Sequence, residues 1–379
     1  MNITYEWVSE DQRVKALVDQ WCSQDFVTID TEFVRTRTFY PQVGLLQVAD
    51  NQGVYLIDPL ALTDLSPLTH LLQDPTTIKV LHSGSEDAEI FHYFFKAHSR
   101  AVFDSQIGAG VLGLGMSIGY ANLVKAELDF DVPKEETRSD WLKRPLSESQ
   151  KQYAALDVHF LYQIYQKHAA LLRTAGRFSW VIEDSERMIS AALPNDTLDY
   201  YQKIRVAWQL KGERLWLLQQ LASWRELQVA QMDIPRARFI KDAVLANIAQ
   251  MKPTSVQQLH QVADLSHRTV KQWGDTIVAF SNAANEIPKS DYPQRIMGPL
   301  KKEASTLLKS LRVFLEEICL VEDIPVELVA RKKYLELLIN SGLYTGAYAL
   351  PEYYCGWRKD LVGTPLLEKL SQLDRIQQG

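Results

Sequence analysis

The sequence of 379 residues has few of the features that mark secreted, membrane or zinc-finger proteins. Its three cysteines, Cys22, Cys319 and Cys355, lie too far apart in the chain for a thiolate zinc knuckle, and their odd number fits a reducing compartment. We therefore expect three buried thiols. No run of about 18 apolar residues occurs, and the N-terminus lacks a basic segment followed by an apolar one. These absences predict a cytoplasmic protein that is neither exported nor membrane-spanning.

Neither of two common nucleotide-binding motifs is supported by the sequence. No G-x-x-x-x-G-K-[ST] motif occurs, which excludes a P-loop helicase. Gly108-x-Gly110-x-x-Gly113 matches a dinucleotide fingerprint, but no convincing strand-turn-helix unit surrounds it, so we interpret these glycines as helix-packing positions. The remaining composition, 46% hydrophobic and 23% charged, is that of an ordinary folded protein with two or three domains.

The charge is distributed unevenly along the chain. The net charge is −6, but residues 1–200 hold 17 Lys and Arg against 28 Asp and Glu, whereas residues 201–379 hold 24 against 19. This split suggests an acidic half that could hold metal ions and a half that could approach a polyanion. Within the second half, Lys203–Lys252 carries nine basic and four acidic residues, which could track a phosphate backbone or form a solvated face.

Hydrophobic periodicity predicts an α/β region followed by helices. Strands are predicted at Phe26–Thr31, Val43–Ala49, Val54–Ile57 and Thr77–Leu81, and helices at Val14–Cys22, Asp87–Lys96, Ser147–Leu172 and Glu183–Leu193. The run Gln42–Asp58 has the pattern of a hairpin, so part of the sheet should be antiparallel. Strand signals end near residue 117, and Pro194-Asn195-Asp196 predicts a break.

The helical C-terminal half contains an internal repeat with an offset of 90 residues. An Asp-Ile-Pro turn recurs at Asp233-Ile234-Pro235 and Asp323-Ile324-Pro325, with matching apolar stripes on both sides of it. The matched stripe positions are Leu217, Leu218, Leu221 and Trp224 with Leu307, Leu308, Leu311 and Phe314, and Leu245 and Ile248 with Leu335 and Leu338. Two small helical domains are therefore predicted, divided within Ala283–Pro299 where proline and glycine cluster.

The segment Phe26-Val-Thr-Ile-Asp30-Thr31-Glu32-Phe33 places two carboxylates at the end of an apolar strand. Residues two apart on a strand point to the same face, so Asp30 and Glu32 should lie side by side. Adjacent carboxylates repel unless a cation lies between them, and hard ions such as Mg²⁺ or Mn²⁺ prefer oxygen ligands. The alternative is that the apolar strand simply ends here and polar residues begin.

Two further acidic motifs have structural explanations when each is considered alone. His82-Ser-Gly-Ser-Glu86-Asp87 follows a predicted strand, and Ser83 with Glu86 has the pattern of a capping box, so Asp87 could serve only as a first-turn acid. In Tyr153-Ala-Ala-Leu-Asp157 the phenol and the carboxylate share one helix face. There, Tyr153 could pack against the sheet while Asp157 is solvated.

In combination, these motifs resemble those of a known family, the DEDD 3′–5′ exonucleases in their tyrosine-bearing subtype. The motifs Asp-x-Glu, Asp and Tyr-x-x-x-Asp follow one another in that family's order. Ser139-Asp-Trp-Leu-Lys-Arg-Pro-Leu146, which leads into the Tyr153 motif, is similar to the sequence of bacterial ribonuclease D. The helical repeats, including Gly356-Trp-Arg-Lys-Asp-Leu-Val-Gly363, resemble HRDC domains. A related subtype has His at the position of Gln152, so Tyr153 is the matching residue here.

The resemblance implies an α/β, ribonuclease H-like mixed-sheet exonuclease domain over residues 1–195. Two all-α, HRDC-like helical domains would follow, over residues 205–285 and, in degenerate form, over residues 295–379. It implies further that two divalent metal ions, Mg²⁺ or Mn²⁺, are held by Asp30, Glu32, Asp87 and Asp157, with Asp30 shared between them. Tyr153 would orient the attacking water. Additional candidates for substrate contact are Thr31, Phe33, His82 and Gln106, and core packing explains the last three at least as well.

The activity that the resemblance implies is a metal-dependent 3′–5′ exoribonuclease. Its substrate would be RNA with a free 3′ end, such as a tRNA precursor, and its products nucleoside 5′-monophosphates; we expect a monomer without membrane association. One alternative is a 3′–5′ exonuclease that acts on DNA. Another is a noncatalytic nucleic-acid-binding protein with a decayed nuclease fold, which the presence of all five expected site residues argues against.

Overall fold

The structure, a computed structural model, describes residues 2–133, 136, 139–193 and 196–378 and contains two compact units. The first unit consists of Met1–Val34, Pro41–Leu193 and Leu300–Gly379, and the second of Arg35–Tyr40 and Pro194–Pro299. The predicted break at Pro194-Asn195-Asp196 falls at a unit boundary, although Pro194 and Asn195 lie outside the described residues. The three predicted domain ranges remain a prediction. In the structure, the second helical repeat belongs to the same compact unit as the nuclease range.

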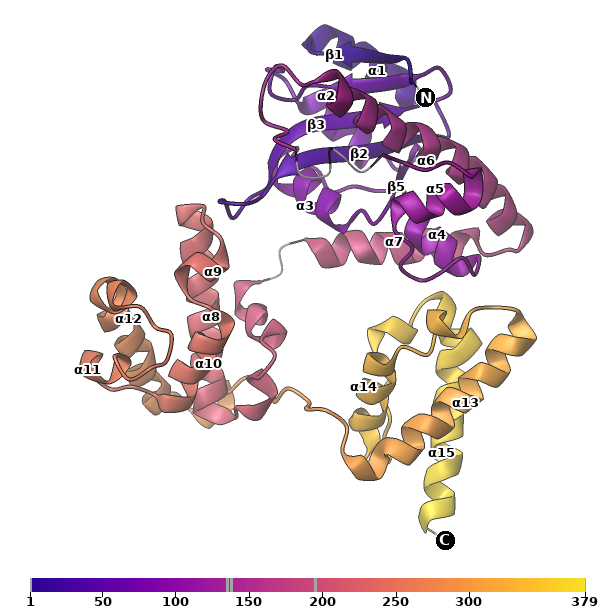
Figure 1. Cartoon of the computed structure of the whole chain (residues 1–379). Coiled ribbons are helices and arrows are strands. Elements are labelled where there is room, and N and C mark those ends of the chain that lie inside the picture. Colours follow the sequence, from indigo (N-terminus) through magenta and orange to yellow (C-terminus); the bar gives the residue numbers. More distant parts are fainter. Residues whose placement is uncertain (1, 134–135, 137–138, 194–195, 379) are drawn as a thin grey trace. The chain divides into compact units, whose positions relative to one another are not determined.

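The described part of the first unit contains one six-stranded sheet (Figure 1), and its mixed character agrees with the sequence-based prediction, which included four of the strands. Its strands are β1 (Tyr5–Val8), β2 (Phe26–Val34), β3 (Gln42–Ala49), β4 (Val54–Ile57), β5 (Ile78–Leu81) and β6 (Val102–Asp104). They are arranged in the order β1-β4-β3-β2-β5-β6. β3 runs antiparallel to β2 and β4, while the other three pairs are parallel. The predicted Gln42–Asp58 hairpin is therefore confirmed, and a purely parallel sheet is excluded.

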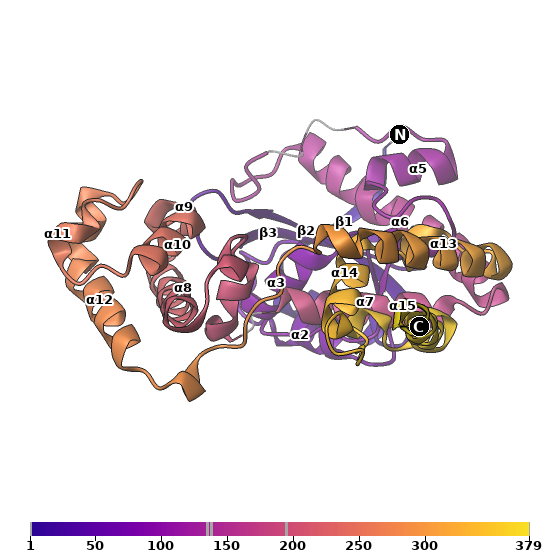
Figure 2. The ribbon, with the colours of Figure 1, turned by 90° about the horizontal axis from the view of Figure 1, so that it is seen from below.

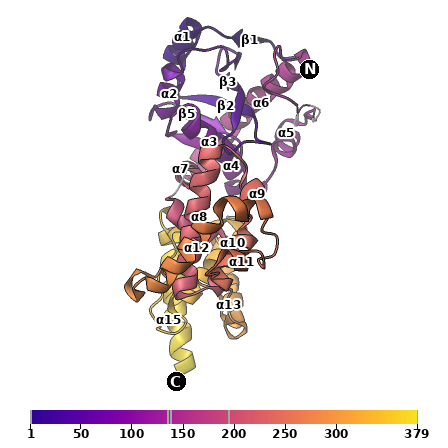
Figure 3. The same cartoon turned by 90° about the vertical axis from the view of Figure 1, so that its left-hand side faces the viewer.

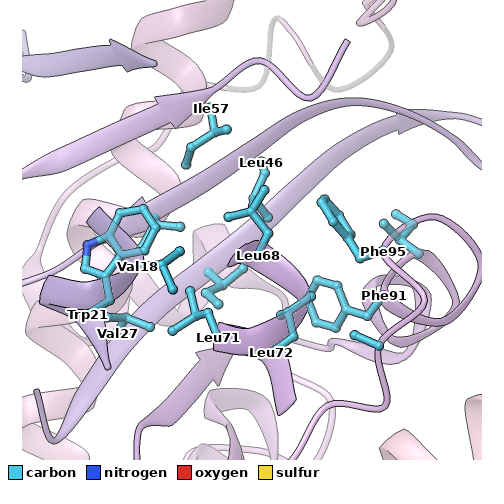
Figure 4. Close-up of a cluster of buried hydrophobic side chains, with 14 of the residues drawn as sticks. Val18, Trp21, Val27, Leu46, Ile57, Leu68, Leu71, Leu72, Phe91 and Phe95 are labelled. Carbon is cyan, nitrogen blue, oxygen red and sulfur yellow. The ribbon is translucent and has the colours of Figure 1, made fainter. Parts of the chain in front are cut away.

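One face of the sheet is covered by α1 (Asp11–Trp21), α2 (Ser66–Gln73) and α3 (Ser85–Tyr93). Each of these helices places its apolar side chains in a single core with the inward-facing residues of β2 to β4. Figure 4 shows this packing, in which Trp21 from α1, Leu68 from α2 and Phe91 from α3 are each at most 1% exposed. Odd-numbered residues of β2, such as Val27 and Ile29, point into this core.

The opposite face of the sheet is covered by α6 (Glu148–Thr174), which carries the Tyr153 motif. Even-numbered residues of β2 face this helix, and the Thr28 hydroxyl donates a hydrogen bond to the Val158 carbonyl of α6 at 2.9 Å. The alternation of β2 thus directs Asp30 and Glu32 toward α6. The remaining helices of this region are α4 (Ser105–Val111), α5 (Tyr120–Leu128) and α7 (Phe178–Ala192).

Helix ends and glycines differ in part from the sequence-based prediction. The capping box predicted at Ser83 and Glu86 is wrong: the N-cap of α3 is Gly84, which has no side-chain cap and whose N–H donates to Asp104 at 2.8 Å. The glycines of the dinucleotide-like fingerprint lie in and just after α4, where a Cβ on Gly108 would come within 2.9 Å of the Phe103 ring. A Cβ on Gly110 would come within 3.1 Å of the Met116 sulfur, so the interpretation as packing positions is confirmed for Gly108 and Gly110, whereas Gly113 has a φ of 82° and lies after the end of α4.

Two other predictions from composition can be compared with the structure. Of the three free thiols, Cys319 is buried, but Cys22 and Cys355 are only half-buried, so that part of the prediction is wrong. Among the described residues, no helix has both the length and the apolar character needed to cross a membrane.

The second unit is helical, and its main helices are α8 (Gly212–Met232), α10 (Asp242–Met251) and α12 (His267–Glu286). Figure 3 shows this helical group, in which α10 and α12 both pack against α8. The short helices α9 (Arg236–Phe239) and α11 (Val256–Leu259) connect them. The core of this unit contains the predicted stripe residues Leu217, Leu218 and Leu221, which are all fully buried.

The predicted repeat is present as two matching helix pairs. In the second copy α13 (Ser305–Glu322) corresponds to α8, and α14 (Lys332–Gly342) begins 90 residues after α10. The turns also match, because Asp233 and Asp323 both end their helices in the left-handed conformation, with φ of 48° and 50°. Asp adopts this conformation more readily than most residues. The chain ends with α15 (Thr364–Gln378).

The second repeat packs against α7 of the nuclease region within the first unit (Figure 2). Trp180 and Trp357 stack with ring centroids 4.1 Å apart, and the Arg358 guanidinium, 2% exposed, donates to both Asp184 carboxylate oxygens at 2.6 Å. Arg177 donates to the Glu322 and Asp323 carbonyls at the end of α13. Removing one partner of a buried bidentate ion pair strongly destabilises a folded protein, because the other charge is left unpaired. The second repeat therefore contributes to the stability of the nuclease region.

Candidate active site

Two elements bring the predicted acidic residues together. β2 presents Asp30 and Glu32 on the face toward α6, and α6 presents Tyr153 and Asp157 one turn apart. The start of α6 is fixed by a capping box, in which the Ser147 hydroxyl accepts from the Gln150 N–H at 3.1 Å and the Gln150 side chain accepts from the Ser147 N–H.

The carboxylates of Asp30, Glu32 and Asp157 form one cluster. One ligand atom from each lies within 4.8 Å of the other two. They line a pocket of about 160 Å³, whose full lining is Asp30, Glu32, His82, Tyr120, Tyr153, Asp157 and Leu161. The structure thus joins residues that are up to 127 positions apart in the chain.

Burial and mutual repulsion shift the pKa values of these carboxyl groups upward. Burial and the charges of Asp157 and Asp87 raise the pKa of Glu32 to about 9, and burial raises the pKa of Asp157 to about 8. The pKa of Asp30 is also well above its ordinary value, because of burial and the three neighbouring carboxylates. Without a counter-charge, this cluster would hold protons at neutral pH.

The cluster has the properties that a divalent metal site requires. All of its donors are carboxylate oxygens, which hard ions such as Mg²⁺ and Mn²⁺ prefer. Among the described residues, Asp157 Oδ1 is buried and has no hydrogen-bond partner. A buried carboxylate oxygen without a partner is costly, and a bound cation would satisfy it and reverse the upward pKa shifts.

Asp87 lies beside this cluster rather than in its closest group. It is 8% exposed in the first turn of α3, and its carboxylate accepts a hydrogen bond from the Thr31 hydroxyl. Its charge acts on both Asp30 and Glu32. Burial raises the pKa of Asp87 to about 6, even though the Thr31 hydrogen bond acts in the opposite direction. Thr31 therefore holds Asp87 in place from the neighbouring strand.

The other candidates for substrate contact have different surroundings. His82 lines the pocket, where its Nδ1 lies 2.8 Å from the Ser105 hydroxyl and its buried Nε2 has no partner among the described residues. Phe33 packs against the core beneath α1 to α3. The Gln106 side chain donates to the Ile118 carbonyl at 3.0 Å and is not among the pocket-lining residues. Packing therefore accounts for Phe33 and Gln106 in this structure.

Sequence reasoning missed Tyr120 and Leu161 as pocket residues. The Tyr120 hydroxyl donates a hydrogen bond to the Asp157 main-chain carbonyl. Burial, and to a smaller extent the charge of Asp157, raises the pKa of Tyr120. Tyr120 thereby fixes the backbone of α6 beside the carboxylate. Leu161 follows Asp157 by one helical turn, and this spacing is the one signal that could have placed it on the pocket face.

Comparison with known proteins gives consistent matches for both parts of the chain. A family model described as 3′–5′ exonuclease matches residues 5–172, and an HRDC domain model matches residues 214–280. A ribonuclease D from Pseudomonas paraeruginosa is 38% identical over 96% of this chain and 97% of the relative. The chain belongs to the ribonuclease D family. The crystal structure of Escherichia coli RNase D covers 98% of this chain and 99% of its own, with 32% identity and a TM-score of 0.88.

Membership of the ribonuclease D family accounts for the architecture and the site together. The matched exonuclease range contains Asp30, Glu32, Asp87, Tyr153 and Asp157, and the matched HRDC range lies inside the first predicted helical domain. The family identifies the protein as a 3′–5′ exoribonuclease with a metal-dependent type of active site. The roles of the individual residues remain predictions.

Proposed function

We propose that the protein shortens the 3′ ends of structured RNA, such as tRNA precursors, and releases nucleoside 5′-monophosphates in a reaction that uses two divalent metal ions. We propose further that it acts as a monomer in the cytoplasm. The observation that carries the proposal is the cluster of Asp30, Glu32 and Asp157 in one pocket with the Tyr153 ring. The E. coli relative is an exoribonuclease involved in structured RNA processing, which supports the choice of substrate.

In this proposal the carboxylates have distinct tasks. Asp30, Glu32 and Asp157, whose carboxylate oxygens lie together, would hold the first ion, and Asp87, held by Thr31, would help to hold the second beside them. When bound, the ions would lower the pKa of the attacking water and offset negative charge at the scissile phosphate and the leaving 3′-oxygen. The high pKa values of Glu32 and Asp157 mean that these side chains release protons when the ions bind.

Tyr153 has the position of an orienting residue in the same pocket. It lies one turn before Asp157 on α6, and its ring packs near Trp141, with centroids 6.2 Å apart. This packing limits the rotation of the ring, so that its hydroxyl can hold the attacking water in one direction. The Tyr120 hydrogen bond to the Asp157 carbonyl supports the same turn of helix from the other side.

The proposal is tested by incubating the full chain with a 3′-extended tRNA in Mg²⁺, in Mn²⁺ or in chelator. A product ladder that shortens from the 3′ end, with nucleoside 5′-monophosphates released, is expected with metal and not with chelator. A DNA strand of equal length serves as the comparison. Faster degradation of the DNA, or cleavage that continues in chelator, would contradict the proposal.

A further inference from the structure

The connection between β2 and β3 folds with the first helical repeat rather than with the sheet. β2 and β3 remain paired up to Val34 and Gln42, and of the seven residues between them the first six, Arg35–Tyr40, belong to the second compact unit. We refer to these six residues as the 35–40 loop. Because the loop follows β2 directly, and β2 carries Asp30 and Glu32, residues of the loop are close in the chain to the active site.

The 35–40 loop is held by hydrogen bonds and a cation–π contact with the Asp-Ile-Pro turn of the first repeat and the residue after it. One carboxylate oxygen of Asp233 accepts the N–H groups of both Phe39 and Tyr40, at 2.9 and 3.0 Å. Phe39 is 8% exposed, and the Arg236 guanidinium lies 4.8 Å from the centre of its ring. Within the loop, Arg35 Nε donates to the Phe39 carbonyl at 3.1 Å. The loop therefore has a defined conformation.

The basic residues of this unit divide into two groups. Some are used in internal ion pairs: Arg225 with Glu226 and Asp242, and Arg236 with Glu226. Others are exposed and have no ion-pair partner among the described residues, and these include Arg37 in the loop and Arg238 in α9. Arg37 and Arg238 lie on two segments that touch where Arg236 covers Phe39.

The charge of the unit favours an anionic ligand at these two arginines. The unit holds 15 Lys and Arg against 10 Asp and Glu, whereas the rest of the chain holds 26 against 37. A nucleic acid strand that approaches the acidic nuclease region is therefore attracted by the basic unit. The ions at the carboxylate cluster would neutralise only the scissile phosphate, so phosphates further along the strand need other partners.

Chain connectivity limits how far the loop can be from the catalytic strand. Arg37 follows Glu32 by five residues, and an extended chain spans at most about 3.6 Å per residue, so their Cα atoms lie no more than about 18 Å apart. A single strand whose 3′ end reaches Glu32 thus has phosphates within this distance of the loop. The constraint holds for any arrangement of the two units.

We propose that Arg37 and Arg238 form a binding site for the RNA backbone upstream of the 3′ end, and that Asp233 keeps this site in place by holding the 35–40 loop. This inference rests on the proposed function for its substrate, RNA, and adds a second point of contact outside the metal site. Arg37 and Arg238 contact phosphates, while Asp233 is a positioning residue that touches no RNA. The first repeat is thereby assigned a specific task in loading the strand.

The first test replaces both arginines, with Arg37→Gln and Arg238→Gln combined in the full chain. Binding of a single-stranded RNA of about 16 nucleotides, the upper end of the site lengths of single-strand-binding folds, is measured in chelator at several salt concentrations. Two lost contacts should make the slope of log K against log salt shallower by about 1.4, since each phosphate contact on a single strand contributes about 0.7. With metal present, KM for this RNA should rise, while kcat and the cleavage of a dinucleotide stay unchanged.

The matched control combines Arg268→Gln with Lys271→Gln, two exposed residues of α12 in the same unit. This variant has the same net charge as the test variant. It should bind the long RNA with a slope close to that of the unmodified protein. An equal change of slope and KM in both double variants would overturn the proposal, because the effect would then come from net charge alone.

The second test separates the positioning role of Asp233 from charge. Asp233→Gly removes the acceptor, and glycine tolerates the left-handed conformation at this position. Asp233→Asn removes the same charge but keeps an acceptor oxygen for the two loop N–H groups. Both variants are more positive, so charge alone predicts tighter RNA binding for both. We expect weaker binding for Asp233→Gly and unchanged or tighter binding for Asp233→Asn; identical behaviour of the two would overturn the positioning role.

Failure of the proposed function would give a different result from failure of this site. If the unmodified protein did not shorten RNA with metal present, the proposed function would fail, while the binding measurements in chelator would still report on the arginines. If the unmodified protein shortened RNA and the arginine variants matched their control, only the site would be wrong.

Discussion

Replacing Asp30 with Asn should stabilise the metal-free protein while abolishing cleavage. The substitution keeps the volume of the side chain and removes one of three carboxylates whose oxygens lie within 4.8 Å of one another. Two unit charges at that separation repel by about 3 kcal/mol at an effective dielectric constant near 20. Protonation of the cluster already relieves much of this repulsion, so we expect a gain of about 1 to 2 kcal/mol, which raises the Tm by a few degrees.

The gain should depend on pH in a defined direction. Burial and neighbouring charge raise the pKa of Glu32 to about 9, and burial raises that of Asp157 to about 8, so in chelator the folded protein holds protons that the unfolded chain has released. The unmodified protein therefore loses stability as the pH rises from about 4.5, the ordinary carboxyl range, toward 9. The advantage of Asp30→Asn should be larger at pH 8 than at pH 5.

The assay is a set of thermal melts in chelator and in Mn²⁺ at both pH values. Divalent ions should raise the Tm of the unmodified protein strongly at pH 8 and that of Asp30→Asn little, because a ligand that binds only the folded state stabilises it. Asp19→Asn, an exposed carboxylate on α1, is the control for the change in charge. If Asp30→Asn lowered the Tm in chelator, or if Mn²⁺ stabilised it as much as the unmodified protein, the metal assignment would be refuted.

Three further predictions concern other parts of the structure. Tyr153→Phe should reduce kcat by about 10²- to 10⁴-fold with little change in Tm, measured by single-turnover cleavage of RNA; full turnover with a lower Tm would make Tyr153 structural. A fragment ending at Leu193 should be poorly soluble and melt early, because it exposes Trp180 and leaves Asp184 without Arg358; a soluble fragment with the Tm of the full chain would contradict this. Gly44→Ala should cost about 1 to 3 kcal/mol in a denaturant titration, because its Cβ would lie 2.3 Å from the Trp141 carbonyl oxygen; an unchanged midpoint would refute the close packing.

Much of the nuclease region could be predicted from sequence because its signals are local. The alternation of β2 is enough to place Asp30 and Glu32 on one face, and helical spacing is enough to pair Tyr153 with Asp157. The short strands β1 and β6 were missed, since four and three residues carry too little periodicity to recognise. The mixed sheet was nevertheless predictable from the single hairpin of β3 and β4.

The contacts that could not be predicted are those between segments far apart in the chain. Tyr120 reaches the backbone of Asp157 from another helix, and no local pattern announces that hydrogen bond. The basic stretch Lys203–Lys252 shows the same limit, because its charges were counted as one group. In the structure Arg225 and Arg236 are occupied by acidic partners, while Arg238 is exposed. Only the three-dimensional structure separates structural charges from those available to a ligand.

The two Asp-Ile-Pro turns provide hydrogen-bond acceptors at matching positions of the two repeats. Each turn ends a helix, where the dipole and the last carbonyl groups concentrate negative potential, and each adds an aspartate in the left-handed conformation. A turn of this kind can therefore accept hydrogen bonds from main-chain N–H groups or from a guanidinium group. In the first copy the Asp233 carboxylate accepts two main-chain N–H groups of the 35–40 loop. In the second copy the Glu322 and Asp323 carbonyls accept the guanidinium of Arg177. The same turn therefore offers two kinds of acceptor, a side-chain carboxylate in the first copy and main-chain carbonyls in the second, and each copy binds a different kind of donor.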